Sequence, residues 1–390
     1  MLFSYTFLVL MDIYRNPRSG KREENREVDF IEEKYMERAI ELAKQGIGAV
    51  NPNPLVGAVI VKKGNILAEG YHRRYGELHA ERDAFSQLTE SAKGAELYVT
   101  LEPCCHYGKQ PPCTQAIIEH GIKKVYVGSQ DPNELVAGKG IRLLKNAGIE
   151  VETGILKEAC DELNTVFFHY ITKKTPYVVM KYAMSLDGKT AAYTGKSRWI
   201  SGEESRRYVH ELRNALTGIM VGIKTVLQDD PMLNCRIEGG RNPVRIICDS
   251  GLNLPLDSKI VQTAKEIRTI VLTVTPPSEK WKRLEERQVE ILLTKEADGR
   301  VDLNDAMRLL GEQQIDGILL EGGGTLNEAA LRAGIVNRVV VFLAPMLLGG
   351  NAGYSPVSGQ GVESPKEAWR SKPVKMTKLG EDFVFVYDIL

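Results

Sequence analysis

Hydrophobic and polar positions alternate along the first half of the chain with the periods of short helices and strands. Two apolar runs flank a Lys-Gly-Asn turn and predict a hairpin over residues 56–71. Further strands are expected at residues 96–101, 124–128 and 150–153, and helices at 33–45, 79–88, 113–119, 141–146 and 156–172. This alternation predicts a three-layer α/β domain whose sheet is largely parallel at one edge.

The second half repeats the α/β rhythm with different motifs. Strands are expected at residues 177–184, 218–222, 244–248, 269–274, 317–320 and 338–343, and helices at 203–214, 303–312 and 326–333. Residues 374–390 predict a terminal antiparallel hairpin. The basic stretch Lys173-Lys174-Thr175 ends at Pro176 and is expected to separate the halves. We therefore expect an extension over 1–30, one domain over 31–174 and another over 175–390.

The N-terminal segment is apolar from Leu2 to Met11 and then rich in both charges. The apolar run is too short to span a bilayer, and it has neither a basic start nor a small-residue cleavage site. We expect residues 1–30 to be a weakly ordered extension, unless the true start lies nearer Met36. No membrane partner is expected.

Charge and cysteine usage narrow the class of protein. The chain has 51 basic and 51 acidic side chains, so its overall charge does not indicate a polyanion-binding protein. Six cysteines are too few and too clustered for a disulfide framework in 390 residues. The cluster at 104, 105 and 113 instead indicates metal ligands in a reducing compartment, so we expect a cytoplasmic protein. The charge balance leads us to expect no nucleic-acid partner.

The strongest chemical signal is His79-Ala80-Glu81 followed by two Pro-Cys pairs, at Cys104 and Cys113. A hydrolytic zinc site needs three protein ligands and one open position, which one imidazole and two thiolates supply. Glu81 would carry a proton from water to a departing amine. The pattern is that of a zinc deaminase, although its Cys-x8-Cys spacing differs from the usual C-x-x-C. Cys105 adjoins Cys104, so we expect it outside the ligand set.

Two other interpretations remain open on the residues alone. A structural zinc site would usually have four protein ligands and no poised carboxylate, so Glu81 argues against a non-catalytic zinc module. A nucleoside or nucleic-acid base deaminase with an unrelated accessory domain is disfavoured by the long Cys104–Cys113 spacing and by the zero net charge.

Longer motifs in both halves resemble one family. The runs NPNPLVGAVIV, LEPCCHYGKQPPC and DPNELVAGKGI in the first half, and KYAMSLDGKTA, GKSRWIS, TVLQDDPMLNCR and EGGGTLNEAAL in the second, are similar to the bifunctional deaminase/reductase of riboflavin biosynthesis. The resemblance covers residues 34–390. It implies a cytidine-deaminase-like domain followed by a dihydrofolate-reductase-like domain, with Zn2+ and NADPH as cofactors.

The implied reactions are consecutive. Zinc-dependent hydrolysis removes the 2-amino group of 2,5-diamino-6-(5-phosphoribosylamino)pyrimidin-4(3H)-one, and NADPH-dependent reduction then gives 5-amino-6-(5-phosphoribitylamino)uracil. The expected partner is this small phosphorylated pyrimidine, and we expect a homo-oligomer. In the first domain, the resemblance implies that Asn51 contacts the pyrimidine and that Lys109, Asp131 and Asn133 hold the sugar phosphate. Cys105 and Glu134 depart from the residues frequent in the family, Ser and Pro, and we expect Glu134 to face solvent.

In the second domain, the residues alone indicate a binding site less clearly than the zinc motif does in the first. The turn from Glu321 to Thr325 carries three glycines before a helix, which suits a phosphate but lacks the G-x-G-x-x-G dinucleotide pattern. The resemblance implies cofactor contacts at Ala183, Trp199, Thr225, Asp229, Gly323, Gly324 and Thr325. It implies substrate contacts at Ser197, Arg213, Leu233, Arg236 and Glu321. The residues alone favour solvated arginines at Arg213 and Arg236, and they leave open a core aromatic at Trp199 and a surface lysine at Lys181.

Overall fold

The computed structural model describes residues 26–390 except 109, 134–135 and 351–353, with side chains from residue 32 onward. The described residues form two compact units that divide between Lys173 and Lys174. Among the described helices, none combines the length and the apolar character that crossing a bilayer requires.

The first unit is built on a sheet with the order β2-β1-β3-β4-β5. Its strands are β1 (Gly57–Lys62), β2 (Asn65–Tyr71), β3 (Glu96–Leu101), β4 (Lys124–Ser129) and β5 (Glu150–Thr153). β1 pairs antiparallel with both β2 and β3, whereas β3, β4 and β5 are mutually parallel. The expected parallel edge is therefore confirmed.

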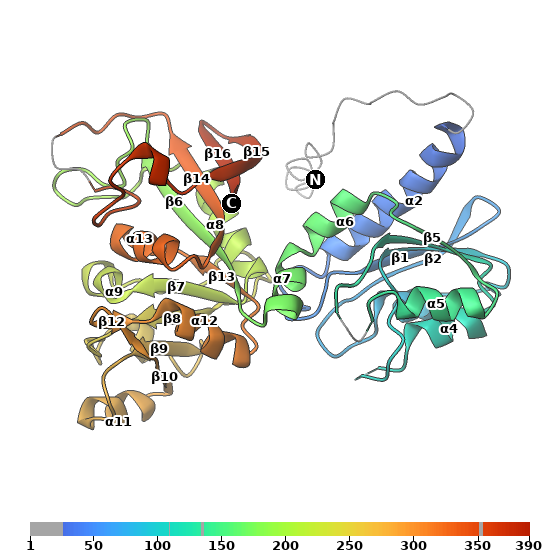
Figure 1. Ribbon diagram of the computed structural model, residues 1–390, viewed down its shortest axis with the longest axis horizontal. Coiled ribbons are helices and arrows are strands. Elements are labelled where there is room, and N and C mark those ends of the chain that lie inside the picture. Colours follow the sequence, from blue (N-terminus) through green and yellow to red (C-terminus); the bar gives the residue numbers. More distant parts are fainter. Residues whose placement is uncertain (1–25, 109, 134–135, 351–353) are drawn as a thin grey trace. The chain divides into compact units, whose positions relative to one another are not determined.

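Helices cover both faces of this sheet (Figure 1). One side carries α2 (Arg26–Lys44) and α6 (Lys157–Leu163), and the other carries α3 (Ala80–Ser86), α4 (Cys113–Glu119) and α5 (Lys139–Asn146). Successive side chains of β1 point to opposite faces of the sheet, so both faces are apolar and both are covered by helices. Ala58 and Ile60 belong to one buried cluster, and Val59 and Val61 belong to the other. The three-layer arrangement is confirmed.

Helix α2 begins at Arg26, within the expected N-terminal extension; the rest of that extension lies outside the described residues. One expectation for the first unit needs correction. The single helix expected over 156–172 is instead α6 and α7 (Thr165–Lys173), separated at Asn164. The Asn164 side chain binds the backbone of Leu55, so a tertiary contact accompanies this break.

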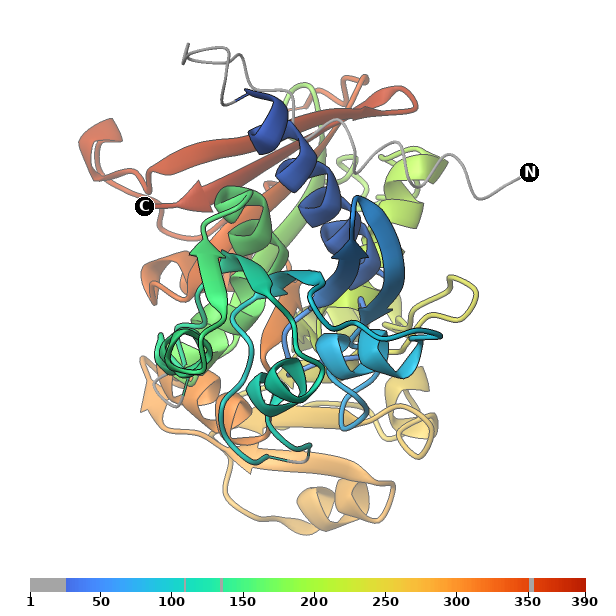
Figure 2. The same ribbon diagram turned by 90° about the vertical axis from the view of Figure 1, so that its right-hand side faces the viewer.

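The second unit has a sheet with the order β10-β9-β8-β7-β13-β6-β14-β16-β15. Its strands are β6 (Tyr177–Ser185), β7 (Gly218–Gly222), β8 (Val244–Cys248), β9 (Thr269–Thr273), β10 (Val289–Leu293), β13 (Gly317–Leu320), β14 (Val336–Ala344), β15 (Ser371–Leu379) and β16 (Asp382–Ile389). The strands from β10 to β14 in that order run parallel. Figure 2 shows the expected terminal hairpin, β15 and β16, as a long antiparallel pair.

Helices again pack on both faces. The buried cluster on one face includes residues of α12 (Leu303–Glu312) and α13 (Gly324–Arg332), and that on the other includes residues of α9 (Ile223–Asp229), α10 (Lys259–Gln262) and α11 (Glu279–Glu285). Along β7, Met220 joins the first cluster while Ile219 and Val221 join the second. The remaining elements are α8 (Glu203–Ala215), the two-residue strands β11 (Glu296–Ala297) and β12 (Arg300–Val301), and the 3-10 turn Pro365–Glu367.

The pattern along the sequence missed α9, α10, α11, β10, β11 and β12. Each contains seven residues or fewer, so its apolar spacing alone does not separate a helix from a strand or a loop.

Candidate active sites

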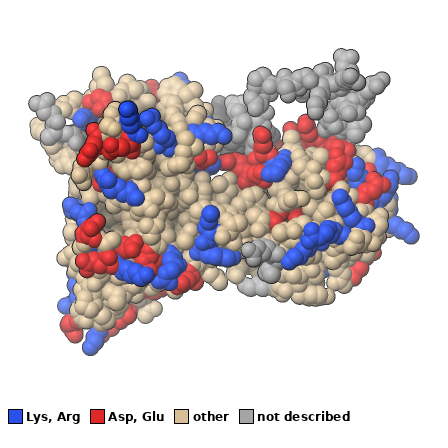
Figure 3. Space-filling model, viewed as in Figure 1, with Lys and Arg blue, Asp and Glu red and all other residues tan. Residues whose placement is uncertain are grey.

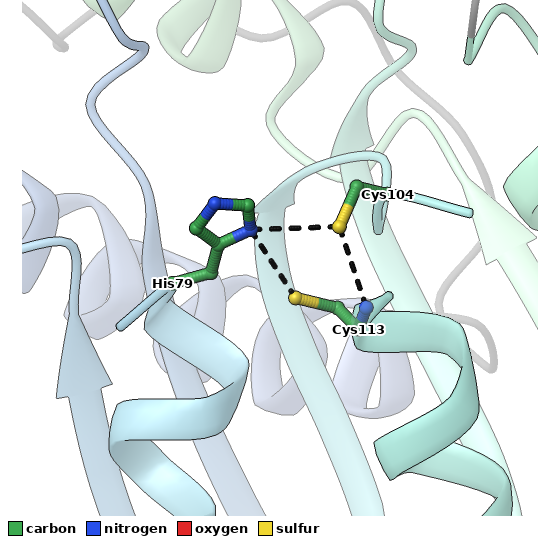
Figure 4. A group of neighbouring side chains, drawn as sticks. All are labelled: His79, Cys104 and Cys113. Atoms are coloured by element: carbon green, nitrogen blue, oxygen red, sulfur yellow. Dashed lines mark hydrogen bonds between the residues drawn. The ribbon is translucent and has the colours of Figure 1, made fainter. Parts of the chain in front are cut away.

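His79, Cys104 and Cys113 come from three segments of the first unit and meet in one group (Figure 4). His79 is the N-cap of α3, Cys104 lies in the loop after β3, and Cys113 is the first residue of α4. One donor atom from each lies within 4.8 Å of the others. The fold therefore assembles the three predicted zinc ligands.

The spacing of these donors fits a tetrahedral zinc ion. Nδ1 of His79 lies 3.4 Å from Sγ of Cys104 and 3.5 Å from Sγ of Cys113. Ordinary Zn–N and Zn–S bonds at a tetrahedral angle place nitrogen and sulfur about 3.5 Å apart. The backbone N–H of Cys113 donates to Sγ of Cys104 over 3.3 Å, as expected for a helix N-terminus beside a thiolate.

The surroundings of this group lower the pKa of the Cys104 thiol and raise the pKa of the Glu81 carboxyl. A hydrogen bond from Cys113 lowers the pKa of Cys104 to about 4. Glu81, in the first turn of α3, is 3% exposed, and burial raises its pKa. Cys105 does not belong to the donor group found among the described residues.

His72 supports the zinc ligands and was not predicted from the sequence. Its Nδ1 donates to the carbonyl of Leu78 over 2.9 Å, and its Nε2 accepts from the amide of Asn53 over 3.1 Å. Its ring lies edge-on to that of His79 at 5.6 Å. His72 thus joins the Asn51–Pro54 turn to the segment that carries His79, and the half-buried Asn51 lies in that turn.

The expected sugar-phosphate residues are only partly described. Asp131 follows β4 and is buried, and one of its oxygens accepts from the backbone N–H of Asn133 over 2.8 Å. Burial raises the pKa of Asp131 to about 6. Lys109 and Glu134 lie outside the described residues.

In the second unit, several candidate cofactor residues lie at one edge of the parallel sheet. β6, β7 and β13 are parallel neighbours, so Ala183 near the end of β6, Thr225 in α9 after β7, and the glycine turn after β13 share that edge. A Cβ on Gly323 would lie 3.8 Å from Oγ1 of Thr225. A glycine turn at the N-terminus of the nine-residue helix α13 fits a cofactor phosphate.

Gly324 is required for packing as well as for backbone access. A Cβ there would lie 1.9 Å from Oγ of Ser358 and 2.6 Å from the carbonyl of Ser355. Any larger residue would push this segment away from helix α13, so the turn keeps its shape only with glycine.

The candidate substrate residues Arg213 and Glu321 form a buried ion pair, with side chains 13% and 14% exposed. Lys181 is half-buried beside them, and burial lowers its pKa while the charge of Glu321 opposes the shift; it is not a surface lysine. His210, one turn before Arg213 in α8, accepts from Nε of Arg236 over 3.1 Å. The i, i+3 spacing of His210 and Arg213 places both on one face of the helix, and this spacing is the signal that the sequence carries for His210.

The other candidate residues have diverse surroundings. Leu233 is buried in the loop after α9, and Asp229 is exposed at the end of that helix. Ser197 is exposed, and Trp199 is 63% exposed with its ring 4.7 Å from the guanidinium of Arg206. Trp199 is therefore not a core aromatic.

Two family models match the chain, one in each half. Residues 31–129 match the cytidine and deoxycytidylate deaminase zinc-binding region, and residues 176–385 match the RibD C-terminal domain. These matches confirm the two expected kinds of domain in the expected order.

Relatives match nearly the whole chain. The riboflavin biosynthesis protein RibD of Actinobacillus pleuropneumoniae is 52% identical over 91% of this chain and 95% of its own length, and that of Aquifex aeolicus is 44% identical over 92% and 98%. The solved structure of Acinetobacter baumannii RibD has a TM-score of 0.84 and 37% identity, covering 93% of this chain and 99% of its own.

A second similar solved structure is that of a protein whose name includes both activities. It is a diaminohydroxyphosphoribosylaminopyrimidine deaminase/5-amino-6-(5-phosphoribosylamino)uracil reductase from Thermotoga maritima, with a TM-score of 0.84 and 39% identity over 93% of this chain and all of its own. The chain therefore belongs to the RibD family of bifunctional riboflavin biosynthesis enzymes, which join a zinc-dependent deaminase to an NADPH-dependent reductase.

Proposed function

We propose that the first unit hydrolyses the 2-amino group of 2,5-diamino-6-(5-phosphoribosylamino)pyrimidin-4(3H)-one. The observation that carries this proposal is the donor group of His79, Cys104 and Cys113, which has the spacing of a three-ligand zinc site beside the buried Glu81. Zinc held by these three side chains would supply Lewis-acid activation of water, which makes hydroxide available as a nucleophile at neutral pH. Glu81 takes a proton from the attacking water and delivers it to the amine that leaves as ammonia.

We assign substrate binding in this unit to residues around the same site. Asn51 contacts the pyrimidine, while Lys109, Asp131 and Asn133 hold the sugar phosphate. Support for Asn51 comes from its turn, which is joined through Asn53 and His72 to the segment preceding His79. The fixed turn suits an amide that must select one ring orientation.

The second unit then reduces the ribosyl group of the deaminated product to a ribityl group. NADPH supplies the two electrons when bound. Its contacts are assigned to Ala183, Trp199, Thr225, Asp229, Gly323, Gly324 and Thr325. The contacts with the ribosyl-phosphate substrate are assigned to Ser197, Arg213, Leu233, Arg236 and Glu321. Arg213 and Arg236 suit a phosphate because guanidinium groups bind its oxygens in pairs.

We further propose that residues 31–174 and 175–390 are the two catalytic domains of a cytoplasmic homo-oligomer that does not act on nucleic acid. The six cysteines all lie in the described residues and form no disulfide with one another there, which suits a reducing compartment. Basic and acidic side chains are interspersed on the face in Figure 3, which does not favour a polyanion. The edge strand β15 exposes Val374 and Met376, which supports self-association.

The proposal is tested by giving the zinc-loaded enzyme the diaminopyrimidine phosphate with and without NADPH. Ammonia should be released in both cases, and NADPH should be consumed only after ammonia has formed. The deaminated pyrimidine alone should support NADPH oxidation without ammonia. Deamination of cytidine or of single-stranded DNA in preference to the diaminopyrimidine would contradict the proposed substrate.

A further inference from the structure

Asn164 lies at the break between α6 and α7 and binds a residue 109 positions earlier in the chain. Its side-chain oxygen accepts from the backbone N–H of Leu55 over 2.8 Å, and its amide nitrogen donates to the carbonyl of Leu55 over 2.9 Å. Asn164 is 2% exposed. It therefore holds both backbone groups of Leu55 where water has little access to replace either bond.

Leu55 directly follows the Asn51–Pro54 turn, and the other side of that turn is tied toward the zinc ligands. The Asn53 amide donates to His72, whose own backbone N–H donates to the carbonyl of Val56 over 3.0 Å. His72 in turn binds the carbonyl of Leu78, the residue before His79. The turn is thus held between Asn164 on one side and His72 on the other.

We propose that Asn164 is a positioning residue of the deaminase, which fixes the Asn51–Pro54 turn relative to the zinc ligands and so sets the pose of the pyrimidine. The inference rests on the proposed contact between Asn51 and that ring. An error of about 1 Å in the placement of a reacting group costs up to about a hundredfold in rate or affinity, so a rigid anchor at this turn has functional value.

The chemistry of the contact requires a side-chain amide. Leucine has the same branching of side-chain atoms but larger methyl groups, and it leaves both the N–H and the carbonyl of Leu55 buried without Asn164 as partner. Ionised aspartate has nearly the size of asparagine and keeps an acceptor for the N–H of Leu55 but presents no donor to its carbonyl. Asn164→Leu therefore removes both bonds, and Asn164→Asp removes one with little change in size.

The test uses the full-length, zinc-loaded enzyme. We expect Asn164→Asp and Asn164→Leu to raise the KM of deamination about tenfold to a hundredfold, with a smaller change in kcat and with the zinc content unchanged. Amide hydrogen exchange should accelerate in residues 51–56 more than in the rest of the unit. Reduction of the deaminated pyrimidine by the same variants should be unchanged, because that site lies in the second unit.

Tyr35→Phe is the matched control, because it also removes one hydrogen bond inside the first unit, from the Tyr35 hydroxyl to the carbonyl of Gly64 at 2.6 Å. It should lower stability without raising KM. If both Asn164 variants lower the melting temperature as Tyr35→Phe does and leave KM unchanged, Asn164 is purely structural and the inference is overturned. Should Asn164→Leu fail to fold, Asn164→Asp decides.

Asn51→Ala separates this inference from the proposed function. When Asn51→Ala raises KM and the Asn164 variants do not, only the positioning role fails. When Asn51→Ala leaves KM unchanged, the assignment of Asn51 fails and the inference fails with it. In the supporting case, Asn51→Ala/Asn164→Asp should have a KM close to that of Asn51→Ala alone, because both changes act through one contact.

Discussion

Arg213 and Glu321 are joined by two parallel hydrogen bonds, from Nε and Nη2 of the arginine to the two carboxylate oxygens at 2.8 and 2.9 Å. Nη1 of Arg213 donates to the carbonyl of Asn234 over 3.0 Å. These contacts engage three of the five guanidinium N–H donors, and the described part of the chain shows no partner for the other two. Burial opposes the ionisation of Glu321, but the charges of Arg213 and Lys181 outweigh it and lower its pKa to about 2.

We predict from this pair that Arg213→Lys impairs substrate binding in the reductase. Lysine keeps the charge but cannot bind Glu321 and an incoming phosphate through a planar fork. The KM for the deaminated pyrimidine should rise about tenfold to a hundredfold, whereas the KM for NADPH should change little. Steady-state kinetics with each substrate varied in turn checks this, and deamination by the same variant serves as the control. An unchanged KM for the pyrimidine would remove Arg213 from the binding site.

Glu81→Gln should abolish deamination while leaving reduction intact. Glutamine keeps the size and hydrogen-bonding capacity of Glu81 but cannot carry a proton, so the loss should be about a hundredfold to ten-thousandfold. Zinc content is measured by atomic absorption, ammonia release reports deamination, and NADPH oxidation with the deaminated pyrimidine reports reduction. Deamination at the wild-type rate would exclude Glu81 from the mechanism, and loss of both activities with zinc retained would contradict two separate sites.

The ligand assignment distinguishes two neighbouring cysteines. Cys113 belongs to the donor group with His79 and Cys104, whereas Cys105 does not. We expect Cys113→Ser to lose most of its zinc and its deaminase activity, and Cys105→Ser to retain both. The zinc-to-protein ratio after dialysis against a weak chelator measures the difference. A drop in zinc content in Cys105→Ser as large as that in Cys113→Ser would place Cys105 in the ligand set.

His210 should make the second unit sensitive to acid. Burial and the charges of Arg213 and Arg236 lower its pKa to about 4, against about 6.5 in an unfolded chain. Because the folded state favours the neutral ring, this stabilisation is complete above pH 6.5 and is lost as the pH falls toward 4. At about pH 5 the loss should be about 2 kcal/mol in the free energy of unfolding.

The variant His210→Gln isolates this effect, because glutamine does not titrate. The three tryptophans, Trp199, Trp281 and Trp369, all lie in the second unit, so their fluorescence during urea unfolding reports that unit alone. The wild type should lose more stability than His210→Gln between about pH 8 and about pH 5. Equal losses in the two proteins would show that His210 is not the titrating group.

Local patterns were sufficient for much of the fold and for the identity of the zinc ligands. β3, α4, β5, β7, β8, α12 and β13 have the predicted bounds, because each is a short apolar run or a periodic segment between clear turn residues. His79, Cys104 and Cys113 could be named because few roles other than metal binding explain those residue types in that order.

Long-range contacts decided what the local pattern missed. The helix expected over 156–172 is broken at Asn164, whose side chain binds Leu55 from a distant part of the chain. Lys181 has no unusual neighbours in sequence, yet folding places it beside Glu321 and Arg213. His72 and His210 likewise acquire their roles only from partners on other segments.

The sequence by itself predicted a zinc deaminase site from residue type and spacing, whereas it predicted the reductase only through the resemblance of longer motifs to a known family. Only the tertiary structure decided how those groups are held. The Arg213–Glu321 pair, the Asn164–Leu55 contact and the place of His72 beside His79 each join residues that no local pattern relates. Their strength comes from burial, which removes competing water and exists only once the chain has folded.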